Sequence, residues 1–198
     1  MTLSRLLWTL TFCALLTACG SSPPNDYYIL TAQRSPPPTG SEPALGVGPI
    51  TVPEYLDTAQ MIYDRQGNTV SLSSIDRWAE PLSDGMERVL ALNLAALLNT
   101  QQVQTFPWHP KRTPDMAVKM NVLDLDSSAA GATLIAEWLL YRPGDSSVVR
   151  RRIDTLTTPL GATVAADVAA AYSTLLQELA GIIADEVNRS ARTTRQAN

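Results

Sequence analysis

Residues 81–99 read PLSDGMERVLALNLAALLN, and the rest of the chain can be interpreted around this stretch. Its apolar residues recur at the spacing of one helix face: Met86, Val89, Leu90, Leu94 and Leu97. Asn93 is the one polar interruption of this stripe. Pro81 suits the start of a helix and Asn99 its end. The pattern predicts an amphipathic helix over 82–98.

A second, longer helix is predicted near the carboxyl end, over 164–188. Thr163 suits its N-cap, and an apolar stripe again follows the helical period: Val168, Tyr172, Leu175, Leu179 and Ile182. Alanines fill much of its first half, which allows close packing. Residues 191–198 are polar, and we expect them to form a disordered tail.

Short runs of branched, aromatic and alternating residues surround both helices and predict strands. They lie at 27–30, 45–52, 61–65, 69–73, 103–106, 116–122, 133–141 and 148–156. The order is four strands, a helix, four strands and a helix. Amphipathic helices need an apolar surface to cover. We therefore expect an α/β fold, a two-layer sandwich in which one mixed β-sheet carries two long amphipathic helices on one face, as a single domain over 27–190.

The first residues carry a targeting signal. Arg5 precedes an apolar run over 6–16, which is too short to cross a bilayer. Leu16-Thr17-Ala18-Cys19 then matches the bacterial lipobox, in which the cysteine receives diacylglycerol and palmitate. Residues 1–18 are thus interpreted as a lipoprotein signal peptide and 19–26 as a lipidated tether. The alternative is an ordinary secretory signal in which Cys19 is a coincidence.

Composition excludes several classes of protein. The 198 residues are 45% apolar and 17% charged, with a mean hydropathy of −0.02, too polar for a multi-pass membrane protein. The net charge of −4 disfavours nucleic-acid binding. One histidine and two cysteines leave little for a metal cluster. We therefore expect no enzyme, no cofactor and no metal site.

Individual residues that could carry chemistry also have simpler explanations. His109 lies between Trp108 and Pro110 in a turn, where a histidine is more often an exposed surface residue than a metal ligand. Asp124 and Asp126 would lie on the same face of a strand. Paired carboxylates can act in acid–base catalysis, but aspartates at a strand end are more commonly just solvated. Residues 150–152 are three arginines, which suit either lipid phosphate or, more ordinarily, a charged strand edge that blocks aggregation.

Two segments are candidates for partner binding. Residues 77–82 place Arg77, Trp78 and Glu80 directly before the first helix, and residues 52–57 place Tyr55 between Glu54 and Asp57. Aromatic residues and arginine dominate protein interfaces. The same residues would equally suit a buried structural clasp. Mutations separate the two roles, because only a clasp residue would lower thermal stability.

The lipobox, Tyr27-Tyr28-Ile29-Leu30, the stretch LGVGPITVPEYLD at 45–57 and RWAEPL at 77–82 together resemble the ABC-type transport auxiliary lipoproteins, the PqiC- and YmbA-like group. The resemblance implies a periplasm-facing lipoprotein that docks to an MCE-domain protein and its inner-membrane partners in intermembrane lipid transport. It implies no catalytic residues. Membrane contact would come through the lipid anchor.

Gly20 follows the lipidated cysteine where an aspartate would favour inner-membrane retention, so we expect the outer membrane. Whether the protein forms a homo-oligomer is left open. A structural lipoprotein that assists another envelope machine is the main alternative, and a periplasmic hydrolase is a weaker one.

Overall fold

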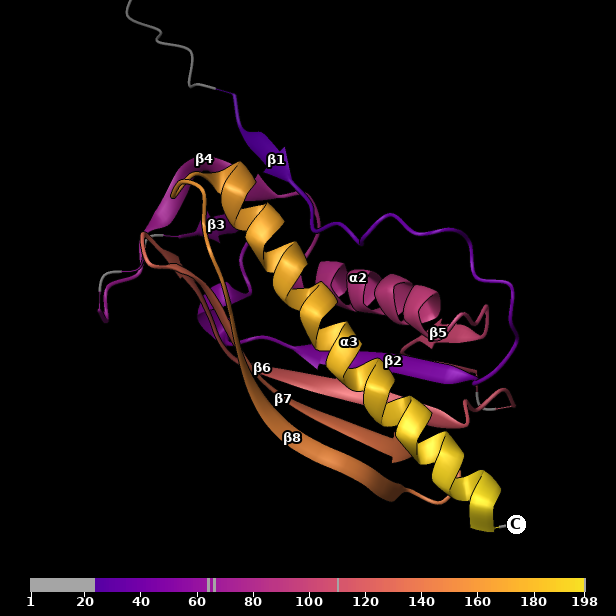
Figure 1. The fold of residues 1–198 in the computed structure, drawn as a ribbon. Helices are drawn as coiled ribbons and strands as arrows, with labels where there is room; N and C mark the ends of the chain where they lie inside the picture. The colour runs from indigo at the N-terminus through magenta and orange to yellow at the C-terminus, as the bar shows by residue number, and fades with distance from the viewer. Residues whose placement is uncertain (1–23, 64, 66, 110, 198) are drawn as a thin grey trace, which may run out of the picture.

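A computed structural model describes residues 24–197 except 64, 66 and 110 (Figure 1). The elements follow the expected order of four strands, a helix, four strands and a helix. The strands before the first helix are β1 (Asp26–Tyr28), β2 (Leu45–Thr51), β3 (Gln60–Ile62) and β4 (Leu72–Trp78), with a short 3-10 helix, η1 (Glu54–Leu56), after β2. After helix α2 (Leu82–Leu97) come β5 (Val103–Thr105), β6 (Met116–Ser128), β7 (Gly131–Arg142), β8 (Ser147–Thr158) and helix α3 (Ala165–Ala197).

The larger sheet has five strands in the order β5-β2-β6-β7-β8. Strand β2 runs parallel to both β5 and β6, whereas β6, β7 and β8 form an antiparallel meander. Residues of β7 alternate between buried and half-buried along nearly the whole strand. This period of two gives the sheet one core face and one outer face.

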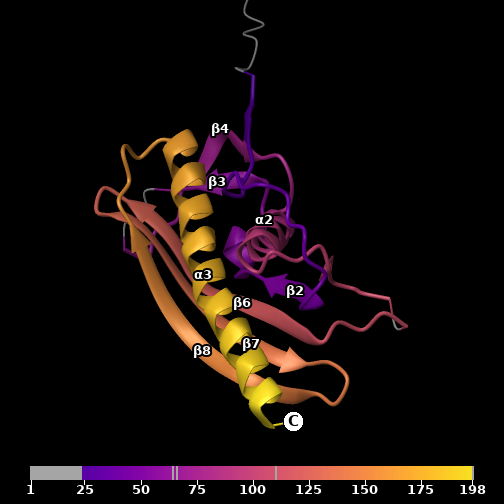
Figure 2. The same ribbon diagram turned by 45° about the vertical axis from the view of Figure 1, so that its right-hand side comes forward.

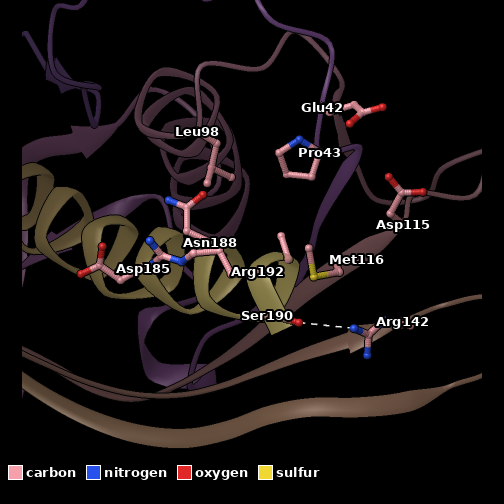
Figure 3. Close-up of a pocket in the computed structure, with 11 residues that line it drawn as sticks. Glu42, Pro43, Leu98, Asp115, Met116, Arg142, Asp185, Asn188, Ser190 and Arg192 are labelled. Atoms are coloured by element: carbon pink, nitrogen blue, oxygen red, sulfur yellow. Dashed lines mark hydrogen bonds between the residues drawn. The ribbon is translucent and has the colours of Figure 1, made fainter. Parts of the chain in front are cut away.

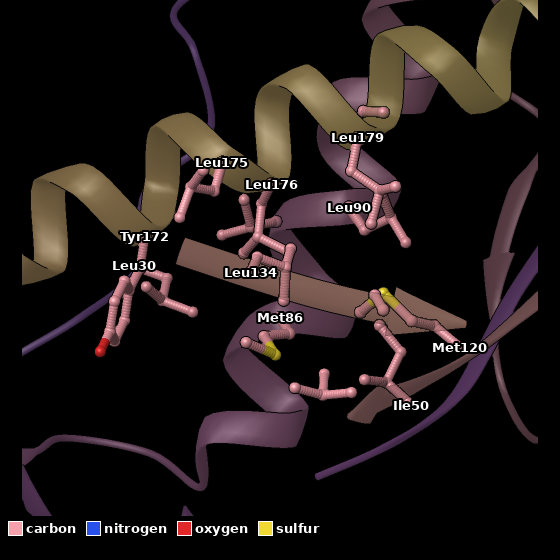
Figure 4. Close-up of a cluster of buried hydrophobic side chains, with 14 of the residues drawn as sticks. Leu30, Ile50, Met86, Leu90, Met120, Leu134, Tyr172, Leu175, Leu176 and Leu179 are labelled. Atoms are coloured by element: carbon pink, nitrogen blue, oxygen red, sulfur yellow. The ribbon is translucent and has the colours of Figure 1, made fainter. Parts of the chain in front are cut away.

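Both helices cover the same face of this sheet, α2 over β2 and β5 and α3 over β7 and β8 (Figures 1 and 2). The two-layer α/β class is therefore confirmed. Apolar side chains from both helices and the sheet meet between the layers, as Figure 4 shows for Met86, Leu90, Met120, Leu134 and Leu179. Burying one such side chain contributes about 1.5–3 kcal/mol, so the apolar side chains between the layers stabilise the packing of the helices on the sheet.

The division of the strands differs from expectation. A single sheet was predicted, but β1, β4 and β3 form a separate three-stranded sheet in the order β1-β4-β3. Strand β1 runs parallel to β4, with Tyr27 beside Arg77 and Tyr28 beside Trp78. β4 also extends to Trp78, into the segment expected to form a loop before the helix. Pairing of this kind depends on residues about fifty positions apart, which local patterns do not encode.

The carboxyl end differs as well. Residues 191–198 were expected to form a disordered tail, but α3 continues to Ala197. Its last turns lie near the end of β7, where Arg142 donates a hydrogen bond to the hydroxyl of Ser190 (3.3 Å). This contact supports the helix beyond its apolar stripe.

Candidate functional site

Trp78 lies inside the fold, at the junction of the small sheet and α3. It is 7% exposed, and its ring stacks on that of Tyr172 with centroids 6.3 Å apart. Burial raises the pKa of the Tyr172 hydroxyl well above its usual range, so this ring stays neutral and packs as an apolar group. For Trp78 the geometry favours the structural clasp over a surface anchor.

Glu80 completes the clasp on the side of α2. Its carboxylate forms an ion pair with Arg88, in the second turn of the helix, and Arg88 also donates to the backbone carbonyl of Leu30 (2.9 Å). Gly85 lies beneath this pair: a Cβ there would stand 3.1 Å from a Glu80 carboxylate oxygen. The segments that follow β1 and β4 are thus joined to α2 by one carboxylate and one guanidinium.

Tyr55 is more accessible, at 37% exposed, and belongs to a polar cluster on the larger sheet. Its hydroxyl donates to Asp124 Oδ1 (3.0 Å), which with Oδ2 also accepts two hydrogen bonds from Arg65 (2.7 and 2.9 Å). Arg65 lies 3.6 Å from Asp126 as well. The hydrogen bonds from Arg65 hold the pKa of Asp124 below its usual range, while burial raises the pKa of the Tyr55 hydroxyl.

The predicted segments 52–57 and 77–82 approach each other through Asp57, while the direct pairing with β4 comes from Ala59 and Gln60, outside the first segment. Gln60 pairs with Arg77 in the β3–β4 ladder, and the amide of Trp78 donates to the carbonyl of Ala59 (2.7 Å). Residues 57–59 and 78–81 together line a hollow of about 270 Å³. Arg77 itself is half-buried and donates to the backbone carbonyls of Ser73 and Ser74 (3.3 and 3.4 Å).

A larger hollow, about 670 Å³, lies at the opposite end of the molecule, beside the last turns of α3 (Figure 3). Its polar lining carries both charges, from Glu42, Asp115 and Asp185 and from Arg142 and Arg192. Pro43, Leu98 and Met116 supply its apolar part. Sequence reasoning missed this hollow because its lining comes from five separate segments.

The remaining candidates have structural explanations. His109 is exposed and accepts a hydrogen bond from the amide of Lys111 (3.1 Å). Asp124 and Asp126 face Arg65, a residue that sequence reasoning did not single out. The arginines at 150–152 are paired with Glu186, Glu137 and Asp154 in turn. Cys19, the predicted lipid attachment site, and the signal peptide lie outside the described residues.

Among the described residues, no group of three His, Cys, Asp or Glu side chains is arranged to hold a metal ion. A helix long and apolar enough to cross a membrane is likewise missing from the part of the chain that the structure describes.

The family of ABC-type transport auxiliary lipoprotein components matches residues 27–184, most of the chain. The chain belongs to this family. A curated relative, the intermembrane transport lipoprotein PqiC of Escherichia coli, is 25% identical over 195 residues, covering 96% of this chain and 97% of PqiC. The Shigella flexneri PqiC matches equally well.

Two solved structures share the fold of this auxiliary lipoprotein component. A protein from Xanthomonas campestris assigned to the DUF330 family superposes with a TM-score of 0.69 at 19% identity, over 86% of this chain and 99% of that one. A crystal structure of an uncharacterized protein gives 0.67 at 18% identity, over 83% of this chain and 99% of that one. The family is one of transport components and not of enzymes.

Proposed function

We propose that this auxiliary lipoprotein is a lipid-anchored docking subunit of an intermembrane lipid transport system and that it works with an MCE-domain protein and its inner-membrane partners. The observation that carries the proposal is the match to PqiC over nearly the full length of both chains. The packing around Trp78 stabilises the fold, as a rigid docking module requires. We assign the protein no catalytic activity.

In this proposal the lipid is attached at Cys19. The lipobox directly precedes a polar stretch, and the first strand begins only seven residues later, at Asp26. Acylation with more than one chain holds a protein stably at a membrane. Gly20 favours the outer membrane, with the domain facing the periplasm.

For the docking surface, we place the accessible contact at Tyr55, with the rest of residues 52–57 around it. Tyr55 combines a partly exposed side chain with a hydroxyl that donates to Asp124, so the partner would meet a side chain that is already ordered. Aromatic anchors with little rotamer freedom lose less entropy on binding.

The test is co-purification of the lipidated protein from membranes, followed by identification of its partners. An MCE-domain protein in the eluate supports the proposal, and a different envelope machine in its place contradicts it. Tyr55→Ala should weaken recovery of the partner at least fivefold while leaving the fold intact. Phe106→Ala, which truncates another exposed aromatic residue, after β5, should leave recovery unchanged. A lower melting temperature for Tyr55→Ala, with normal recovery, would assign Tyr55 to the clasp.

A further inference from the structure

The small sheet presents large apolar side chains to solvent where the chain enters the domain. Tyr27 is 64% exposed and Ile29 51%, although Tyr28 is half-buried and Leu30 is buried. Alternation of this kind sends Tyr27 and Ile29 to the outer side of the sheet. The inner side is occupied by Trp78, which packs against α3. The outer side therefore keeps an aromatic and an aliphatic side chain in water.

A cation lies beside them. Arg77 is the register partner of Tyr27, and the half-buried Ile75 precedes it by two residues on the same strand. The guanidinium of Arg77 donates to two carbonyls of its own strand, and no described carboxylate lies within 4.0 Å of it. Of the arginines around the clasp, Arg65 and Arg88 are both ion-paired. Arg77 thus retains a positive charge that an external anion could meet.

The position of these residues along the chain selects their partner, an argument that rests on the lipid anchor proposed at Cys19. Asp26 follows Cys19 by seven positions, and a fully extended chain of that length spans at most about 25 Å. Helix α3 has 33 residues and is about 50 Å long. It begins on the side of β1 and ends at the far end of the molecule (Figures 1 and 2). Hence β1, and not the far end of α3, is held near the bilayer.

The surface is also held rigidly in place. Directly after Ile29, the carbonyl of Leu30 accepts from Arg88 (2.9 Å) and the amide of Thr31 donates to Ser173 (3.0 Å). The backbone amide of Gln33 donates a hydrogen bond to the side-chain oxygen of Asn93, the polar residue in the apolar stripe of α2 (3.0 Å). Both helices therefore form hydrogen bonds with the segment that follows β1. Contact of Tyr27 and Ile29 with another surface would thus orient the whole domain.

We propose that Tyr27, Ile29, Ile75 and Arg77 form a membrane-contact face that lies on the phospholipid bilayer holding the anchor. Tyrosine favours the interface between water and hydrocarbon, and the guanidinium fork suits lipid phosphate. The face turns a flexible tether into a fixed orientation. The mixed-charge hollow at the end of α3 then points away from this bilayer.

The chain itself allows a clean test, because Cys13 leaves with the signal peptide and Cys19 is consumed by the lipid. Ile29→Cys, or Tyr27→Cys as a second variant, then carries the single labelling thiol of the lipidated protein. A fluorescent label at this position is compared with one at Val148→Cys, which is 61% exposed at the start of β8. The lipidated proteins are reconstituted into vesicles of phosphatidylethanolamine and phosphatidylglycerol that contain a lipid with a nitroxide headgroup.

We expect quenching at residue 29 to exceed that at residue 148 at least threefold. Adding Tyr27→Ser and Arg77→Gln to the Ile29→Cys protein should bring the ratio close to one, while the protein still floats with the vesicles. Equal quenching at 29 and 148 in floating protein would overturn the membrane-contact face and leave the anchor intact. Failure of the protein to float would overturn the anchor itself, and this face with it.

Discussion

The ring of Trp78 stacks on the ring of Tyr172 with centroids 6.3 Å apart and planes inclined by 26°. The two residues come from different halves of the chain, β4 and α3, and their contact joins the three-stranded sheet to the helical layer. Residues 77–82 are thereby fixed in space before α2 begins. Packing therefore accounts for the buried position of Trp78 within the RWAEPL stretch.

Trp78→Ala should lower the free energy of unfolding by about 3–5 kcal/mol, the usual cost of truncating a buried large aromatic residue. Tyr172→Phe keeps the stacked ring and loses only a long hydrogen bond to Ser127 (3.4 Å), so it should cost less than about 1 kcal/mol. Urea unfolding of the domain, followed by circular dichroism, measures both. Comparable losses in the two variants would show that stacking is not the main contribution.

A second prediction concerns Asp124, whose pKa is lowered first by its hydrogen bonds to Arg65. A carboxyl with a lower pKa in the folded state stabilises the fold above its unfolded pKa, about 3.9, and this contribution is lost as pH falls through the folded value. Asp124→Asn should therefore cost about 1–2 kcal/mol at pH 7 and progressively less below about pH 4.

The control for Asp124 is Arg65→Gln, which removes the guanidinium. In this background, Asp124→Asn should have a smaller effect at pH 7 and little dependence on pH between 3 and 7. Unfolding free energies at a series of pH values give the comparison. A pH-independent cost of Asp124→Asn in the otherwise unchanged protein would contradict the role given to the ion pair.

Local sequence patterns were sufficient to predict the helices and most strands, because the spacing of apolar residues follows from which face of each element is buried. The stripe at Met86, Leu90 and Leu94 and the alternation in β6 and β7 have this origin. The division into two sheets was not predictable in this way. It depends on β1 pairing with β4, across about fifty residues, and neither strand carries a signal for its partner.

The candidate site was predicted in part. The sequence singled out Tyr55, Arg77, Trp78 and Glu80 as candidates and left the choice between a clasp and an interface open. It did not indicate Arg65 or Arg88, and it placed Tyr172 in the apolar stripe of the second helix without pairing it with Trp78. Asn93 was visible as a polar interruption, but its role became clear only with the amide of Gln33 beside it.

A third prediction uses Gly85, which stands inside α2 where alanine would be favoured by about 1 kcal/mol. Its Cβ would lie 3.1 Å from the Glu80 carboxylate, which Arg88 holds in place. Gly85→Ala should therefore give little or no gain in the unmodified protein and a gain of about 0.5–1 kcal/mol in the Glu80→Ala background.

Gly181, in α3, is the matched control, because nothing stands within 4 Å of its would-be Cβ. Gly181→Ala should raise the free energy of unfolding by about 0.5–1 kcal/mol in both backgrounds. If Gly85→Ala stabilised the two backgrounds equally, the close approach of Glu80 would have no energetic consequence.

The last prediction concerns membrane attachment. Cys19→Ser should block lipidation and processing at the lipobox, so that no mature, cleaved protein fractionates with membranes. Cys13→Ser is the control: it changes the other cysteine, which lies within the apolar segment of the signal, and should leave lipidation intact. Metabolic labelling with a palmitate analogue and membrane fractionation distinguish the variants.

Density-gradient separation then shows which membrane holds the lipidated protein, for which Gly20 favours the outer membrane. Recovery wholly with the inner membrane would contradict that placement but not the anchor. Mature, cleaved Cys19→Ser protein that still sediments with membranes would instead mean that another part of the chain holds it there.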